Sequence, residues 1–166
     1  MQSKNFCSLA GALLAWILCA PLPLGAQQAE SHVVSAEPAT TLVLRRGAET
    51  DVPLRVVIRS GYHINSNTPA EEYLIPTMLS WSKSSISGIT LRGVTYPKAE
   101  TVNYDFASKP LQVYSGTITV VSRFTVAADA VRGQTRLIGT LRYQACTDRM
   151  CLAPRTLPVS VPAMVE

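Results

Sequence analysis

Apolar and polar residues alternate along much of the chain after its first 26 residues. The clearest run places four apolar residues at every second position: Val52, Leu54, Val56 and Ile58. A two-residue period is typical of a strand with one buried face, so we predict a strand from Asp51 that continues into residues 61–65. Similar runs and short apolar stretches bounded by turn residues predict six further strands, at residues 41–46, 73–81, 89–96, 113–127, 134–145 and 155–161.

This arrangement of strands predicts the fold class. Short strands at fairly regular spacing, separated by Gly, Pro and Ser, favour an all-β immunoglobulin-like β-sandwich with about seven to eight main strands. Pro158 has no N–H to donate, which predicts that the last strand lies at a sheet edge. Residues 98–112 show no period but contain Tyr104 and Phe106. We expect a long loop with aromatic side chains there, and such loops are often functional.

The first 26 residues have the composition of a signal peptide. Lys4 supplies a positive charge, residues 9–24 form an apolar run, and small residues end the segment at Ala26, before two glutamines. This order of charge, apolar run and small-residue site is that of a secretory signal. We therefore predict cleavage after Ala26 and a periplasmic or secreted protein.

Two alternatives for this segment are weaker. A retained membrane anchor is disfavoured because Pro21 and Pro23 break the apolar run into lengths too short to span a bilayer. A lipid-attached form would use Cys19, but Leu18 occupies the preceding position, where lipid attachment needs a small residue. The signal-peptide interpretation explains the segment better than either alternative does.

The part of the chain left after cleavage is long enough for one domain with its own core. We divide it into an N-terminal lead-in at residues 27–39 and a β-sandwich domain at residues 40–166. Loss of Lys4 with the signal lowers the net charge from +4 to +3. This charge is too small and too evenly spread to indicate a nucleic-acid partner.

Cleavage also leaves two cysteines, Cys146 and Cys151, five positions apart. They lie at the end of one predicted strand and before the next, so their sulfurs can come within bonding range. An exported protein sits in an oxidising compartment, where such a pair forms a disulfide readily. Two interpretations of the pair remain: a purely structural bridge and a redox-active pair. The bridge closes a loop of six residues, and a loop that short stabilises a fold by only about 2 kcal/mol in the chain-entropy estimate, which argues against the structural role.

A redox-active pair needs an accessible thiolate and a second cysteine close enough to resolve a mixed disulfide. Between the cysteines, the charge of Arg149 favours a thiolate and that of Asp148 opposes it. A metal site is a poorer alternative, because two thiolates with at most His32 and His63 do not form a convincing tetrahedral set.

Five short motifs are spread over most of the chain after residue 26: GYHINSN at residues 61–67, YLIPT at 73–77, VYSG at 113–116, YQAC at 143–146 and CLAP at 151–154. Together they resemble the N-terminal periplasmic domain family of the thiol:disulfide interchange protein DsbD. The resemblance implies an immunoglobulin-like sandwich that exchanges electrons through Cys146 and Cys151, as a thiol-disulfide oxidoreductase of the protein-disulfide reductase type with no bound cofactor. It also implies that Cys151 is attacked first.

The same resemblance implies partners. The cysteine pair would receive electrons from a membrane electron carrier or a thioredoxin-like protein and pass them to periplasmic thiol-disulfide client proteins. Two rival interpretations stay open. One is a non-enzymatic exported immunoglobulin-like binding or assembly module with a structural disulfide. The other is a subunit in cytochrome c biogenesis or metal handling that works through the same cysteines with a dedicated partner.

The resemblance further implies a shield over the disulfide, because the family covers it with an aromatic side chain on a cap loop. The expected loop at residues 101–109 is where the cap would lie. Phe106 is the candidate shield and Tyr104 the second choice. The alternative is that these aromatic side chains only pack onto the sandwich.

Four residues are candidates for lining the site: His63, Asn65, Tyr143 and Arg149. His63 and Asn65 stand where the family can carry tyrosines, so the resemblance does not fix their roles. His63 either assists proton transfer at a thiol or forms only a local hydrogen bond.

Overall fold

The structure is a computed structural model that describes residues 33–38, 40–82 and 88–166. The predicted signal peptide at residues 1–26, its Cys19, and His32 lie outside the described residues. The described part contains twelve strands and no helix, and so no helix that could cross a membrane. Its strands are β1 (Val34–Pro38), β2 (Leu42–Leu44), β3 (Glu49–Ile58), β4 (His63–Asn65), β5 (Met78–Trp81), β6 (Ile89–Thr95), β7 (Glu100–Val102), β8 (Leu111–Ser115), β9 (Thr117–Val126), β10 (Gly133–Tyr143), β11 (Ala145–Cys146) and β12 (Arg155–Val165).

Two four-stranded sheets form the body of the sandwich. The first has the strand order β1–β3–β9–β6 and the second the order β2–β12–β10–β5. Alternate residues of the long strands face one shared apolar core, as in β3, where Val52, Leu54 and Val56 are fully buried. Across this core the ring of Trp81 on β5 packs edge-to-face on Phe124 of β9, with ring centroids 5.5 Å apart. The predicted all-β immunoglobulin-like sandwich is confirmed.

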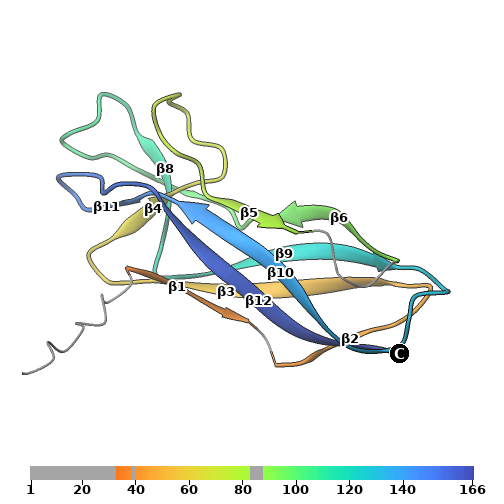
Figure 1. The fold of residues 1–166 in the computed structure, drawn as a ribbon. Coiled ribbons are helices and arrows are strands. Elements are labelled where there is room, and N and C mark those ends of the chain that lie inside the picture. Colours follow the sequence, from red (N-terminus) through yellow and green to blue (C-terminus); the bar gives the residue numbers. More distant parts are fainter. Residues whose placement is uncertain (1–32, 39, 83–87) are drawn as a thin grey trace, which may run out of the picture. The chain divides into compact units, whose positions relative to one another are not determined.

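A third sheet, with the order β11–β4–β8–β7, carries the cysteine region. β4 follows β3 after a turn at Gly61, and β8 leads into β9 through Gly116. These glycines have φ angles of 81° and 61°, a left-handed backbone that glycine adopts without the steric cost of a Cβ. Because β3 pairs with β9, their continuations β4 and β8 pair again, and β11 joins them from β10 of the second sheet. Figure 1 shows β4, β8 and β11 together at one end of the long strands, away from the C-terminus.

The two glycine turns also explain two wrong predictions. The single strand expected at residues 113–127 is divided at Gly116 into β8 and β9, which lie in different sheets. The strand expected from Asp51 to residue 65 is divided at Gly61 into β3 and β4 in the same way. An apolar alternation that continues through a turn does not reveal that the chain has changed sheets.

Three other boundaries differ from the sequence predictions. The strand expected at residues 73–81 covers only Met78–Trp81, since the N–H of Leu74 closes a turn onto the Glu71 carbonyl at 3.1 Å. The expected loop at residues 98–112 contains β7 and the start of β8, which pair with each other. The expected lead-in contains β1, which pairs with β3. In the last two cases a partner strand, rather than a local pattern, defines the element.

The last strand is longer than predicted and is only partly at an edge. β12 runs on to Val165 and lies between β10 and β2 in the second sheet. Within the described residues, however, β2 pairs only with positions 163–165 of β12. Pro158 therefore has a strand partner on one side, Thr140 of β10. The edge prediction is right for Pro158 itself and wrong for the C-terminal end of the strand.

Candidate functional site

Cys146 and Cys151 form a disulfide at the end of the molecule where the third sheet lies. Their Cα atoms are 3.9 Å apart, and the two residues form an isolated antiparallel bridge. The two halves of the disulfide differ in exposure: Cys146 is 0% exposed, whereas Cys151 is partly exposed. An incoming reagent therefore meets Cys151 before Cys146.

A tight turn joins the two cysteines. The N–H of Thr147 donates to the carbonyl of Met150 at 2.8 Å, and the Thr147 hydroxyl accepts from the N–H groups of Arg149 and Met150 at 3.3 and 3.2 Å. Its own backbone and one threonine side chain thus hold the turn closed. Arg149 and Met150 are exposed at its tip, Met150 at 58%.

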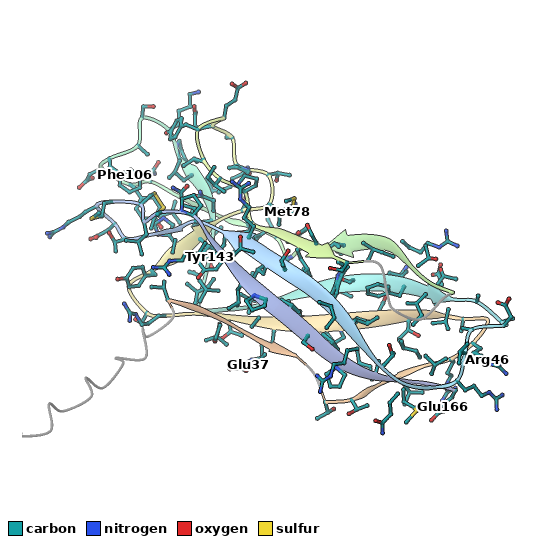
Figure 2. All side chains as sticks on the ribbon, in the orientation of Figure 1. Glu37, Arg46, Met78, Phe106, Tyr143 and Glu166 are labelled. Carbon is teal, nitrogen blue, oxygen red and sulfur yellow. A yellow bond between two sulfur atoms is a disulfide. The ribbon has the colours of Figure 1, made fainter. Side chains whose placement is uncertain are left out.

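An aromatic stack leads from the strand beside Cys146 to the surface. His63 of β4 is the register partner of Cys146 on β11 and is only 4% exposed. The ring of Tyr104 stacks on His63 with centroids 4.3 Å apart, and Phe106 stacks on Tyr104 at 5.5 Å. Phe106 is 41% exposed. Figure 2 shows it at the same end of the described domain as the yellow disulfide.

The aromatic loop and the cysteine turn face each other across an open hollow. Its lining comes from both segments: Asn103, Tyr104, Asp105, Phe106, Asp148 and Arg149. A second hollow alongside it is lined by Gly61, Tyr62, His63, Tyr104, Ser115 and Asp148. The structure thus brings the expected cap loop and the cysteine turn together, and Tyr104 and Asp148 line both hollows.

Burial sets the protonation states in the second hollow. Loss of solvation lowers the pKa of His63, and the Asp148 carboxylate opposes that effect. Loss of solvation also raises the pKa of the Tyr104 phenol, and the charges of Glu100 and Asp148 raise it further. Near neutral pH the site therefore presents a neutral imidazole and a protonated phenol. The Nε2 atom of His63 is buried and has no hydrogen-bond partner within the described structure.

Gln144 is a site residue that the sequence analysis missed. Its Oε1 accepts from Asn65 Nδ2 at 3.1 Å and from the N–H of Ile75 at 3.3 Å. Its Nε2 donates to the carbonyl of Leu152 at 3.2 Å. Gln144 therefore ties β4, the segment before β5 and the exit of the cysteine turn together. The sequence signal for it is a polar side chain two positions before Cys146, near the apolar end of the predicted strand at residues 134–145.

The remaining candidates take different positions. Asn65 is fully buried, and its Nδ2 also donates to the carbonyl of Ile75 at 3.0 Å, so it belongs to the Gln144 network. Tyr143 is buried in the main core at the end of β10 (Figure 2). Burial raises the pKa of its phenol, and the charge of Arg155 opposes this. Of these candidates, Arg149 and His63 line the hollows, while Asn65 and Tyr143 support the strands that carry the site.

Of the residues considered for a metal site, the described structure brings His63, Cys146 and Cys151 to one region, with both cysteines joined in the disulfide. Within residues 33–38, 40–82 and 88–166, no group of three or more His, Cys, Asp and Glu side chains is placed to hold a metal ion. His32 lies outside these ranges.

Comparison with known proteins identifies the family. Residues 30–162 match the family described as "Thiol:disulfide interchange protein DsbD, N-terminal". Among solved structures, the DsbD n-terminal domain of Neisseria meningitidis in the reduced form is 20% identical, with 66% of this chain and 74% of that chain covered and a TM-score of 0.43. The N-terminal periplasmic domain of ScsB from Proteus mirabilis is 16% identical, with 78% and 44% covered and a TM-score of 0.50.

The identity to the ScsB domain is low, so that structure supports the fold alone. No curated protein sequence matches the chain. The family match, by contrast, spans most of the chain and includes both cysteines of the disulfide. It confirms the resemblance that the sequence motifs carry. The chain belongs to the family of the N-terminal domain of the thiol:disulfide interchange protein DsbD.

Proposed function

We propose that this domain exchanges its Cys146–Cys151 disulfide with the thiols of partner proteins. Membership of a thiol:disulfide interchange family supports a redox role in general. The observation that carries the proposal for these two residues is the unequal exposure of the bridge, with Cys146 buried and Cys151 partly exposed. Exchange needs one sulfur that a thiolate can reach and a second that serves as an internal leaving group.

The exchange proceeds in two steps. A partner thiolate attacks the sulfur of Cys151, the bond between Cys146 and Cys151 breaks, and its electron pair passes to the sulfur of Cys146. A second partner thiol, as its thiolate, then attacks the mixed disulfide and releases Cys151, which leaves the partner oxidised and the domain reduced. The reverse sequence reduces a client disulfide. Neither direction requires a bound cofactor. In the reverse direction the domain acts as a protein-disulfide reductase.

The proposed partners follow from the family and from the predicted signal peptide. A membrane electron carrier or a thioredoxin-like protein supplies electrons, and periplasmic thiol-disulfide proteins receive them. The matched ScsB domain is described as periplasmic, which supports export of this chain after cleavage at Ala26. A role in cytochrome c biogenesis would be one use of the same exchange.

We also propose that Tyr104 and Phe106 together shield the site. Tyr104 is the inner ring, because it stacks directly on His63, and Phe106 covers Tyr104 from outside. Both rings come from the segment between β7 and β8, which faces the cysteine turn across the first hollow. Movement of this segment would open the approach to Cys151 when a partner docks.

Single-cysteine variants test the proposed order of attack. Cys146→Ala leaves Cys151 as the free thiol, and Cys151→Ala leaves Cys146. With glutathione disulfide as the probe, we expect Cys146→Ala to form a mixed disulfide at least about tenfold faster, since access controls thiol reactivity. Mass spectrometry at timed intervals measures both rates. Equal rates, or no adduct with either variant, would contradict the proposal.

A structural disulfide is the second candidate function. The complete burial of Cys146 favours it, because buried cysteines are usually inert. In that case the domain would be an exported binding or assembly module, and its bridge would resist reduction by thiol proteins. The reduction potential separates the two candidates, since structural disulfides in secreted proteins have potentials below about −300 mV.

A further inference from the structure

His63 lies opposite the buried cysteine. In the antiparallel pairing of β4 with β11, His63 is the direct register partner of Cys146. Side chains of directly opposed residues lie on the same face of a sheet, with Cβ atoms about 4.5–5.5 Å apart. The imidazole and the sulfur of the less accessible cysteine are therefore neighbours on one face.

The imidazole has an unpartnered nitrogen at this position. His63 is 4% exposed, and its Nε2 has no hydrogen-bond partner within the described structure. Buried polar atoms of side chains nearly always have a partner, so an unpartnered one in a native fold calls for an explanation. The Tyr104 ring stacked on the imidazole holds it in place without occupying a ring nitrogen.

We propose that His63 accepts the proton of the Cys146 thiol in the step that closes the disulfide. This inference rests on the proposed function, because it assigns a proton acceptor to the same cysteine pair. It concerns the resolving cysteine only. The partly exposed Cys151 exchanges protons with solvent and needs no such group.

The Cys151 thiolate has attacked a client disulfide, and the client's first thiolate has left and taken a proton from water. Cys146 then passes its thiol proton to Nε2 of His63, and its sulfur attacks the sulfur of Cys151. The bond from Cys151 to the client breaks, and the second client thiolate leaves with the electron pair. It takes up a proton, and His63 returns to the neutral form by giving its own to solvent.

The groups around His63 favour a neutral imidazole at rest and stabilise an imidazolium during the closing step. Burial keeps the imidazole neutral at rest, whereas the Asp148 carboxylate favours the imidazolium once it forms. The other titratable groups near it are the Tyr104 phenol, the neighbouring Tyr62, and Glu100 on β7, which accepts a hydrogen bond from the Ser115 hydroxyl. Ser115 is itself the register partner of His63 on β8. Without a base, burial of Cys146 disfavours the thiolate that the closing step needs.

A two-step reagent isolates this closing step. The reduced domain is mixed with dithiobis(nitrobenzoate) in a stopped-flow instrument, and the two thionitrobenzoate ions are followed by absorbance. Attack by Cys151 releases the first ion, and closure by Cys146 releases the second. In His63→Gln near neutral pH, we expect the first release to stay within about twofold of wild type and the second to slow by at least about tenfold, a modest general-base effect.

The pH dependence separates a base from a packing residue. In the wild-type protein the second release should fall at low pH with a midpoint below the usual histidine pKa of 6.5, because protonated His63 accepts no proton. In His63→Gln the second release should instead rise about tenfold per pH unit, since it depends on the small thiolate fraction. Thr119→Ala is the control: it lies at an exposed position of β9 away from both hollows and should leave both releases unchanged.

The two releases distinguish the role of His63 from the exchange function itself. A second release in His63→Gln with the rate and pH profile of wild type would overturn the role of His63 and leave the exchange function standing. A wild-type domain that releases neither ion would overturn both. Should His63→Gln fail to fold, the wild-type profile decides alone: a second release with no fall at low pH beyond that of the first would contradict the inference.

Discussion

The sandwich body and the third sheet are built by different rules. In the first and second sheets, long strands bury alternate apolar residues such as Leu54 and Leu141 in one core. Four of the five buried polar residues in the described structure instead lie in or beside the third sheet: His63, Asn65, Ser66 and Thr77. Two of their atoms, His63 Nε2 and Asn65 Oδ1, have no hydrogen-bond partner among the described residues.

The sandwich body and the third sheet differ in how their buried groups affect stability. An apolar core gains stability from each group that it removes from water, whereas buried polar groups cost stability unless they are paired. Proteins depart from the most stable arrangement mainly at functional sites. The sandwich body therefore stabilises the fold. The buried polar groups of the third sheet lower that stability and lie beside the disulfide.

The largest effect should come from the sandwich body. Leu54→Ala removes a fully buried side chain from the core and should lower the free energy of unfolding by about 2–5 kcal/mol. The exchange rate of the folded molecules should not change. Denaturant titration and a thiol-exchange assay measure the two quantities. Ile138→Ala, on the exposed face of β10, is the control and should stay within about 0.5 kcal/mol.

A smaller loss of stability should follow from Gln144→Leu. This change removes one of the two acceptors of the Asn65 amide, and it takes the Gln144 partner from the Ile75 N–H and the Leu152 carbonyl, at a cost of about 1–3 kcal/mol. It should also alter the exchange rate, because Leu152 adjoins Cys151. Gln134→Leu, at an exposed position of β10, should do neither. Equal behaviour of the two variants would mean that the polar network does not hold the site.

Phe106→Ala should change the rate of disulfide reduction and leave the free energy of unfolding unchanged. Loss of the outer ring should speed reduction of the disulfide by a small thiol roughly fivefold, equivalent to about 1 kcal/mol of barrier. Tyr73→Ala, a more exposed aromatic outside the stack, should have no effect. Stopped-flow reduction by dithiothreitol measures both. An unchanged rate in Phe106→Ala would remove that residue from the shield.

The smallest effect should be a pH dependence of stability from His63. Its pKa is lowered in the fold by burial, so the unfolded chain binds a proton that the folded domain does not. Stability is therefore present above the usual histidine pKa of 6.5 and is lost as pH falls through the lowered value. Asp51, whose pKa is lowered by its hydrogen bond to Arg123, loses its contribution only below 3.8. Denaturant titrations at a series of pH values measure this effect. The dependence of the free energy of unfolding on pH should differ between wild type and His63→Gln only between the lowered His63 pKa and 6.5.

The same contrast explains what the sequence could predict. The alternation of Val52, Leu54 and Val56 predicts β3 because a long half-buried strand shows its period locally. β4, β7 and β11 span only two or three residues, too few for a period, and exist because neighbouring strands pair with them. The cysteines and the aromatic loop were predictable from residue type and resemblance. The links made by Gln144 depend on contacts with segments far away in sequence.

The reduction potential of the Cys146–Cys151 bridge decides between an exchange domain and a structural disulfide. It can be measured by equilibrating the domain with buffers of reduced and oxidised dithiothreitol and counting free thiols after acid quenching. An exchange domain should titrate above about −300 mV, within reach of thioredoxin-like partners. A potential well below that value would show a permanent structural bridge, and the domain would not exchange its disulfide with partner proteins.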